Sequence, residues 1–236
     1  MKVYETDHIR NLALIGHGGS GKTTLAEALM YQTGVIGRMG KVENGTTLSD
    51  TDVDEVQRQI SINTSLLPVQ YGGYKLNVLD TPGFADFIND VYGALHVADA
   101  ALVVVDAVNG VEVQTERYWR LADARALPRL LLINKMDKEH ASFDTTLGAL
   151  KRRFGNRVVA LQLPIGEQSS FRGLIDLVTM TAYQETDDNS APQAGAIPAE
   201  LQARAAELRE AVVEAAAEAN DALMMKYLEE GELSDA

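Results

Sequence analysis

The stretch Gly16-His17-Gly18-Gly19-Ser20-Gly21-Lys22-Thr23 matches the phosphate-loop pattern G-x-x-x-x-G-K-T. An apolar run at residues 12–15 precedes it and predicts a buried strand, and residues 22–32 are rich in helix formers. A strand, a glycine loop and a helix in this order turn backbone N–H groups and a helix N-terminus toward one point, which makes an anion site. We therefore expect the loop to bind a nucleotide phosphate, with Lys22 reaching the β- and γ-phosphates and the Thr23 hydroxyl on Mg²⁺.

A second motif, Asp80-Thr81-Pro82-Gly83, follows a strand-like run at residues 74–79. An aspartate at the end of a buried strand beside a phosphate loop can hold the shell of a magnesium ion. The N–H of Gly83 can bond a γ-phosphate, so its loop can distinguish a triphosphate from a diphosphate. Because the motif follows a strand and lies downstream of the phosphate loop, it indicates a nucleotide site rather than an ordinary turn.

A third motif, Asn134-Lys135-Met136-Asp137, ends the apolar run at residues 129–133. The carboxylate of Asp137 can accept hydrogen bonds from N1–H and from the exocyclic amine of guanine, and adenine offers no such pair of donors. Asn134 can steady the loop, and the stem of Lys135 can cover the face of the base. The three motifs together predict a guanine-nucleotide site.

Composition and charge exclude several other classes of protein. Of the 236 residues 46% are hydrophobic, enough for a core, and the absence of cysteine excludes disulfides and thiolate metal sites. The charged N-terminus is unlike a signal peptide, and no apolar run is long enough to cross a bilayer. The formal net charge is −13, and residues 185–236 carry thirteen acidic and three basic side chains. We expect a cytoplasmic monomer with no membrane partner and no direct sequence-specific contact to nucleic acid.

The hydrophobic patterns predict an α/β fold, a P-loop domain with a mainly parallel sheet and helices on both faces, followed by a small α+β part from about residue 158 onward. Residues 33–63 contain four glycines and no clear element, which indicates a functional loop. Strands are expected at residues 64–70 and 74–79, paired as an antiparallel hairpin, and at 100–105, 129–133 and 158–163. Helices are expected at residues 84–97, 111–126, 143–154 and 199–230, with a second hairpin at 173–184 and a linker at 185–198.

In this order the motifs resemble those of the translational GTPases, specifically elongation factor G and its paralogues. The matching segments are G-H-x-x-x-G-K-T-T at 16–24, R-x-I-S-I at 58–62, D-T-P-G-F-x-D-F at 80–87, G-V-x-x-Q-T-E at 110–116 and N-K-M-D-K at 134–138. Residues 163–183 resemble the insert subdomain that elongation factor G carries between its fourth and fifth nucleotide motifs. The resemblance implies a GTP-binding core at residues 1–157 and an insert at 158–236, with the fifth motif beyond the chain.

The motifs and the resemblance together imply GTP or GDP and Mg²⁺ as ligands. The implied catalytic residues are Lys22 and Gly83, and the implied metal-site residues are Thr23, Ser61 and Asp80. The implied nucleotide-binding residues are Gly16, His17, Gly18, Gly19, Ser20, Gly21, Lys22, Thr23, Thr24, Asp80, Thr81, Pro82, Gly83, Phe84, Asn134, Lys135, Met136 and Asp137.

Three positions depart from the family pattern. Gly19 stands where the phosphate loop usually has an aspartate, which removes a cation-assisting group. Gln59 replaces a flexible glycine. Phe84 replaces the histidine that orients the attacking water. The departures leave alternatives to a GTP-hydrolysing elongation factor that acts on the ribosome. One is a nucleotide-gated binding module with vestigial hydrolysis, and another is a GTPase of the ribosomal-protection or peptide-chain release type.

Overall fold

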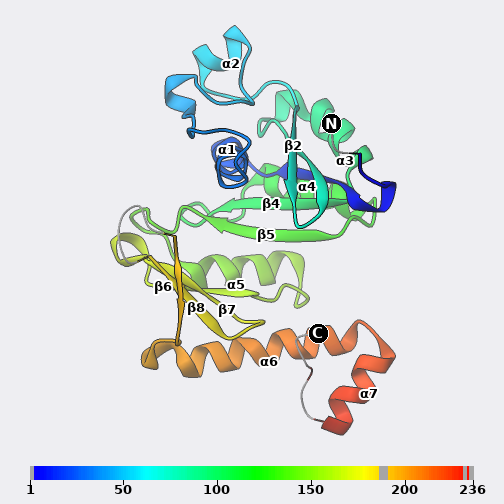
Figure 1. Cartoon of the computed structure of the whole chain (residues 1–236), viewed down its shortest axis with the longest axis vertical. Coiled ribbons are helices and arrows are strands. Elements are labelled where there is room, and N and C mark those ends of the chain that lie inside the picture. Colours follow the sequence, from blue (N-terminus) through cyan, green and yellow to red (C-terminus); the bar gives the residue numbers. More distant parts are fainter. Residues whose placement is uncertain (1–2, 186–190, 231–232, 234–236) are drawn as a thin grey trace. The chain divides into compact units, whose positions relative to one another are not determined.

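The computed structural model describes residues 3–185, 191–230 and 233. Its contacts divide the chain into two compact units, Met1–Lys135 and Met136–Ala236. Figure 1 traces both units along the sequence. Within the described residues, no helix combines the length and the hydropathy that a membrane span requires.

A five-stranded sheet in the order β2-β3-β1-β4-β5 forms the centre of the first unit. Its strands are β1 (Ile9–Ile15), β2 (Ser65–Tyr71), β3 (Tyr74–Asp80), β4 (Ala100–Asp106) and β5 (Arg129–Asn134). The pairs β1–β3, β1–β4 and β4–β5 are parallel, whereas β2 and β3 form the expected antiparallel hairpin. The sheet is therefore mainly parallel, as the patterns predicted.

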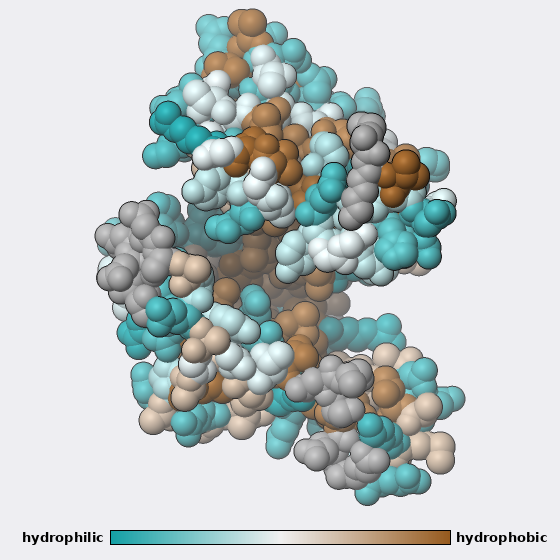
Figure 2. All heavy atoms as spheres, in the orientation of Figure 1, coloured by the Kyte–Doolittle hydropathy of each residue, from teal (hydrophilic) through white to brown (hydrophobic). Residues whose placement is uncertain are grey.

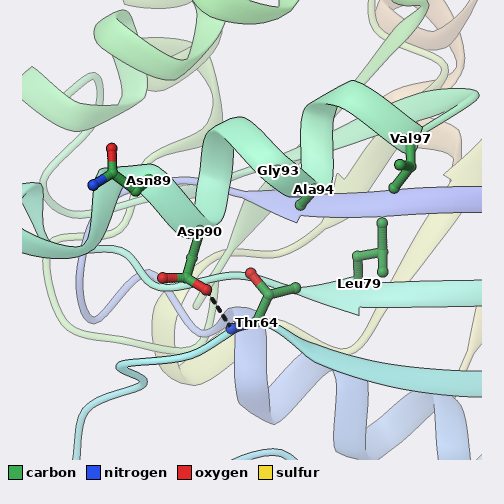
Figure 3. Close-up of a pocket in the computed structure, with 7 residues that line it drawn as sticks. All are labelled: Thr64, Leu79, Asn89, Asp90, Gly93, Ala94 and Val97. Carbon is green, nitrogen blue, oxygen red and sulfur yellow. Dashed lines mark hydrogen bonds between the residues drawn. The ribbon is translucent and has the colours of Figure 1, made fainter.

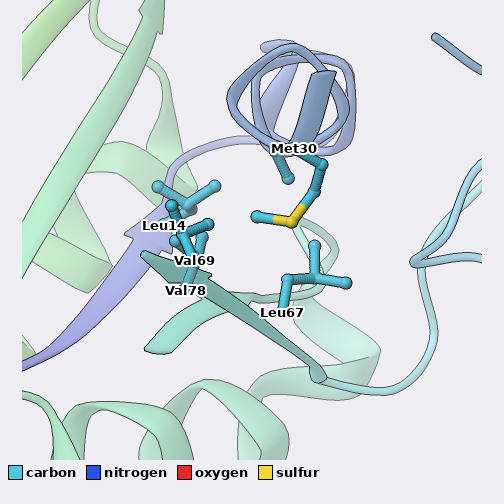
Figure 4. Packing of buried hydrophobic residues seen from close by; sticks show 6 residues of the cluster. Leu14, Met30, Leu67, Val69 and Val78 are labelled. Atoms are coloured by element: carbon cyan, nitrogen blue, oxygen red, sulfur yellow. The ribbon is translucent and has the colours of Figure 1, made fainter. Parts of the chain in front are cut away.

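Helices cover both faces of this sheet. On one face, α1 (Lys22–Gln32) contacts β2 and β3 (Figure 1). Ala26 and Met30 of α1 pack there on Leu14, Leu67, Val69 and Val78 (Figure 4). Ala13 and Ile15 flank Leu14 in β1 and are also fully buried, and because successive side chains of a strand alternate, they face the other side. On that side α3 (Ile88–Val97) contacts β1 and α4 (Val113–Asp123) contacts β4.

The segment at residues 33–63 is more regular than its sequence suggested. It contains a 3₁₀ turn, η2 (Val42–Asn44), and a short helix, α2 (Val53–Arg58). Asp52 and Glu55 form a capping box at the start of α2. This capping box stabilises a helix of six residues, which is too short for a recognisable hydrophobic period. A further turn, η3 (Ala85–Phe87), precedes α3, so the expected helix at 84–97 is divided.

The second unit contains α5 (Phe143–Phe154), as expected, and a four-stranded antiparallel sheet in the order β6-β7-β8-β9. Its strands are β6 (Gln162–Ile165), β7 (Gly173–Asp176), β8 (Thr181–Gln184) and β9 (Gln193–Gly195). The strand expected at residues 158–163 was wrong in position, because pairing with β7 begins at Gln162. Part of the expected linker is β9, and residues 186–190 of that linker lie outside the described residues.

The C-terminal helical pattern forms two helices rather than one. They are α6 (Gln202–Glu218) and α7 (Asp221–Glu230), which contact each other. The Asn220 side chain accepts a hydrogen bond from the backbone N–H of Ala222 at 2.8 Å. A side-chain acceptor of this kind is typical of a helix start, which explains the break within an otherwise helical composition.

Hydrophilic residues dominate much of the surface in view, and hydrophobic residues lie among them in small groups (Figure 2). Exposed apolar side chains include Tyr71 on β2 and Val53 on α2. Scattered exposed apolar residues of this kind are normal for a folded protein.

Leu66 and Leu67 are neighbours on β2 and offer a matched test of the core. Leu67 is 6% exposed and packs against α1, whereas Leu66 is 60% exposed. Leu67→Ala leaves a cavity and is expected to lower the free energy of unfolding by about 2–5 kcal/mol. Leu66→Ala is expected to change it by about 0.5 kcal/mol or less. Urea denaturation measures both values, and equal losses would contradict this packing.

Candidate nucleotide site

The phosphate loop connects the end of β1 to the start of α1. Gly21 is the residue before the first helical turn, and its φ of 99° lies in the left-handed region. A Cβ at Gly21 would lie 2.4 Å from Nδ2 of Asn134, so only glycine allows this close approach. The N–H groups of the first turn of α1 have no partner within the helix, which makes this helix start a candidate anion site.

Lys22 lies inside this loop and is 5% exposed. Its Nζ donates hydrogen bonds of 3.0 Å to the carbonyl oxygens of Gly16 and His17. Burial lowers the pKa of Lys22 to about 8, against the opposing effects of Asp80 and Asp50. An ammonium group has three hydrogens, so one remains for an anionic ligand after the two loop carbonyls are satisfied.

Two hydroxyls and a carboxylate form the candidate magnesium site. Thr23 Oγ1 and Ser61 Oγ lie 3.1 Å apart, which brings the residue 33–63 segment to the start of α1. Asp80 is 1% exposed, and neither of its carboxylate oxygens has a hydrogen-bond partner among the described residues. Burial raises the pKa of Asp80 to about 6, although Lys22 and the nearby Ser49 and Thr23 hydroxyls oppose this shift. A buried carboxylate without a partner beside two hydroxyls fits a hard divalent cation.

No group of three His, Cys, Asp or Glu side chains arranged for a metal occurs in the part of the chain that the structure describes. The candidate ligands are therefore mixed hydroxyl and carboxylate oxygens, as Mg²⁺ uses when a phosphate completes its shell. Asp50 is a carboxylate that sequence reasoning missed. It is 5% exposed, and burial raises its pKa, while a hydrogen bond with Ser61 lowers it.

Sequence reasoning also missed Glu27, a charged residue on the apolar side of α1. It is 2% exposed. Its Oε1 accepts from Gly40 N at 2.8 Å and its Oε2 from Leu48 N at 3.0 Å. A glutamate between the buried residues Ala26 and Met30 was the available signal, because a buried carboxylate needs donors. Glu27 thereby fixes the residue 33–63 segment to the helix that follows the phosphate loop.

Glu55 of α2 holds the other end of the same segment. Its Oε1 accepts from the backbone N–H groups of Ile62 at 2.9 Å and Asn63 at 3.0 Å, and its Oε2 accepts from Asp52 N at 3.1 Å. The residue is 2% exposed. Because Ser61 precedes Ile62, this network positions the Ser61 hydroxyl opposite Thr23.

The second motif continues from β3 along the phosphate loop. Thr81 is fully buried and donates its hydroxyl to Leu14 O at 2.6 Å. Pro82 and Gly83 are also buried, whereas Phe84 is 39% exposed. The Phe84 carbonyl accepts from the Tyr118 hydroxyl of α4 at 3.5 Å. The motif is therefore fixed on both sides of Gly83, because Thr81 is bonded to β1 and Phe84 is bonded to α4.

Two residues of the third motif brace the phosphate loop from β5. Asn134 Nδ2 donates to Ser20 O at 2.9 Å, and Lys135 Nζ donates to Gly19 O at 2.7 Å. Lys135 also pairs with Asp106 Oδ2 at 2.8 Å. Burial alone would raise the pKa of Asp106, but Lys135 and the Val108 N–H lower it below its usual range. The third motif thus supports the loop as well as offering groups for a base.

Met136 and Asp137 begin the second unit. Met136 is buried, and its carbonyl oxygen accepts from Gln168 N at 2.7 Å. The Asp137 side chain is 61% exposed and lies 3.2 Å from Lys138 Nζ. The carboxylate proposed to read guanine is therefore accessible, with one cation beside it.

His17 points from the phosphate loop toward Glu112, with 3.5 Å between Nε2 and Glu112 Oε1. Its Nδ1 is buried and has no hydrogen-bond partner among the described residues. Gly19 and Thr24 are exposed at the loop and on α1. Of the predicted site residues, the structure brings together those of the phosphate loop, Ser61, residues 80–84, Asn134 and Lys135.

A separate pocket of about 440 Å³ lies between α3, β3 and Thr64 (Figure 3). Leu79, Ala94 and Val97 line it with apolar groups, and Asp90 accepts from Thr64 N at 3.4 Å. No residue of the three nucleotide motifs lines this pocket. It is therefore distinct from the candidate nucleotide site.

Comparisons with known proteins show which family the chain resembles. The family model described as the elongation factor Tu GTP-binding domain matches residues 7–229. A protein of known crystal structure from Thermus thermophilus is 39% identical, with a TM-score of 0.89 over 96% of this chain. The match covers 34% of that protein, so the present chain spans about a third of its length.

Because the carboxylate of Asp80 is unpaired, we expect it to lower the stability of the ligand-free protein while it contributes to ligand binding. Its folded-state pKa lies above its usual value of 3.8, so the ionised group destabilises the fold at neutral pH; this cost declines as the pH falls through about 6 and is absent below 3.8. Asp80→Asn is expected to raise the melting temperature of the ligand-free protein by about 2–4 °C or more at pH 7.5. The same variant should lose the further stabilisation given by GDP with Mg²⁺. Thermal unfolding measures both, with the exposed Asp86→Asn as the control, and a lower melting temperature for Asp80→Asn would contradict the account.

Proposed function

Because this chain belongs to the family of the elongation factor Tu GTP-binding domain, a translational GTPase family, we propose that it binds and hydrolyses GTP as part of an elongation factor G-like protein. The observation that carries the proposal is the convergence of Lys22, the Thr23–Ser61 hydroxyl pair and the unpaired Asp80 at one edge of the sheet. Each group has an unused bonding capacity that a nucleotide with Mg²⁺ would satisfy.

Each group of residues in the site has its own proposed role in phosphoryl transfer. The loop N–H groups and Lys22 hold the phosphates and stabilise the negative charge that spreads over them. Thr23 and Ser61 would hold Mg²⁺, and Asp80 would support its shell. Mg²⁺ held by these residues would neutralise negative charge on the phosphates. The N–H of Gly83 would bond the γ-phosphate.

The residues of this protein provide least for the positioning of the attacking water. The phenyl ring of Phe84 can neither accept a proton nor hydrogen-bond a water molecule, unlike the histidine of the family pattern. Losing a positioning or acid–base group typically slows a reaction by about 10²-fold or more. We therefore expect slow intrinsic hydrolysis, with a faster rate when the ribosome supplies the missing contact.

The proposed setting is the cytoplasm, with the ribosome as partner, the chain acting as a monomer and residues 158–236 serving as the insert subdomain. Phe84 also favours a second candidate, a nucleotide-gated binding module in which hydrolysis is vestigial. Turnover of GTP by the full-length protein, with and without ribosomes, distinguishes the two. Ribosome-stimulated turnover supports the GTPase, and nucleotide binding without turnover supports the module.

Base selection provides a direct test of the third motif. If Asp137 accepts from two guanine donors, GTP should bind at least about 10²-fold more tightly than ATP, since a carboxylate that a base covers without donating to it is left unpaired, at a cost of about a few kcal/mol. Asp137→Asn should shift the preference toward xanthosine nucleotides. Calorimetry gives the affinities, and Asp144→Asn on the exposed side of α5 is the control. Comparable GTP and ATP affinities in the wild type would refute the assignment.

The chemical role of position 84 is tested by Phe84→His. An imidazole can orient water, so this variant should hydrolyse GTP about 10²-fold faster on ribosomes, with GTP affinity nearly unchanged. Single-turnover kinetics at saturating ribosomes measure the rate, and Phe87→His serves as the control. Rapid hydrolysis by the isolated wild type, or no rate change in Phe84→His, would show that another group positions the water.

A further inference from the structure

Asp106 is a buried carboxylate that belongs to none of the three nucleotide motifs. It is the last residue of β4 and pairs in register with Asn134, the last residue of the neighbouring strand β5 (Figure 1). Lys135 follows Asn134 directly, so the two strands bring the lysine close to the carboxylate. Asp106 is 5% exposed, and a carboxylate at this depth needs partners for its oxygens.

The two oxygens of Asp106 have different partners. Oδ1 accepts from the backbone N–H of Val108 at 2.8 Å and from that of Asn109 at 3.4 Å, which fixes the turn after β4. Oδ2 pairs with Lys135 Nζ at 2.8 Å. Although burial alone would raise it, Lys135 and the N–H groups of the turn hold the pKa of Asp106 below its usual value. The carboxylate is therefore ionised at neutral pH.

A second aspartate makes the same turn and shows what the turn requires. Asp176 is the last residue of β7, and its Oδ1 accepts from Val178 N at 2.8 Å and from Thr179 N at 3.2 Å. A turn of this kind takes one side-chain oxygen, which the amide of an asparagine also supplies. The negative charge of the residue at position 106 therefore serves Lys135 rather than the turn.

Lys135 depends on this charge for its position. Its φ of 62° lies in the left-handed region, and such a conformation persists in a lysine only where surrounding contacts fix it. Its ammonium group has two acceptors, Gly19 O at 2.7 Å and Asp106 Oδ2. The side chain is 33% exposed, so without Asp106 its flexible stem can turn toward solvent. Asp106 and Gly19 together hold the stem between the third motif and the phosphate loop.

We propose that Asp106 is a positioning residue for the nucleotide, which acts through Lys135 and slows the release of guanine nucleotides. A stem that is already fixed does not have to be ordered when it covers the base, so the bound state loses less entropy. Because the stem covers the base rather than a phosphate, its effect is the same for diphosphate and triphosphate and independent of Mg²⁺. The inference rests on the proposed binding of guanine nucleotides.

The test is a double-mutant cycle on the rate constant of GDP dissociation. Asp106→Asn keeps an oxygen for the turn and replaces the oxygen that faces the lysine, whereas Lys135→Met keeps an apolar stem without the ammonium group. Each single variant should raise the rate constant about fivefold or more, within the usual range of coupling between residues in contact. In the Lys135→Met background, Asp106→Asn should raise it no further. A non-hydrolysable GTP analogue, and GDP with EDTA in place of Mg²⁺, should give the same factors.

Asp176→Asn is the matched control, because it makes the same exchange in the same kind of turn, and its rate constant should equal that of the wild type. A wild-type rate in Asp106→Asn, an equal effect of Asp106→Asn in both backgrounds, or an effect confined to the GTP analogue would overturn the inference. GDP binding would continue to support the proposed function in each of these cases. Absence of GDP binding by the wild type would overturn both.

Thermal unfolding without nucleotide separates positioning from a purely structural role. Asp106→Ala also removes the acceptor of the turn, so its melting temperature should lie below that of Asp106→Asn. The two variants should nevertheless release GDP at similar rates, because both lack the contact with Lys135. Fast release from Asp106→Ala together with wild-type release from Asp106→Asn would assign the carboxylate to the turn alone and overturn the inference.

Discussion

The site depends on charged groups that are buried without full compensation from the protein. Lys22, Asp50 and Asp80 are each at most 5% exposed; Lys22 donates to two loop carbonyls, and neither carboxylate oxygen of Asp80 has a hydrogen-bond partner among the described residues. Burial moves the pKa of Lys22 down to about 8 and that of Asp80 up to about 6. Both pKa shifts mean that burial disfavours the charged forms. The ligand-free fold therefore carries a free-energy cost that binding of a phosphate and a cation would remove.

The sheet makes this concentration of charge possible. In parallel strands the carboxyl ends meet at one edge, and Leu14 of β1 pairs in register with Asp80 of β3. The loops that follow β1, β3 and β5 therefore converge, and Asn134 reaches Ser20 across 114 residues of sequence. The hydrophobic cluster beneath α1 fixes the strands, and so the distances within the site.

The segments expected to respond to nucleotide are held in different ways. The residue 33–63 segment is tied down by backbone N–H groups donated to Glu27 and Glu55. Residues 83–84 rest on the phosphate loop through van der Waals contact with a glycine. Hydrogen bonds to a buried carboxylate are costly to break, whereas an aromatic ring at the surface moves readily.

The sequence by itself determined the α/β class, the bounds of α1 and α5, the β2–β3 hairpin and the three nucleotide motifs. These follow from local patterns: hydrophobic period, glycine spacing and the residues at strand ends. Only the tertiary structure decided that Glu27 and Glu55 anchor the residue 33–63 segment, that the C-terminal helical run divides at Asn220, and that Gly18 accommodates Phe84. Each of these features depends on a partner distant in sequence or on a single capping side chain. A local hydrophobic pattern does not show which donors a buried carboxylate binds or which aromatic ring packs against a glycine.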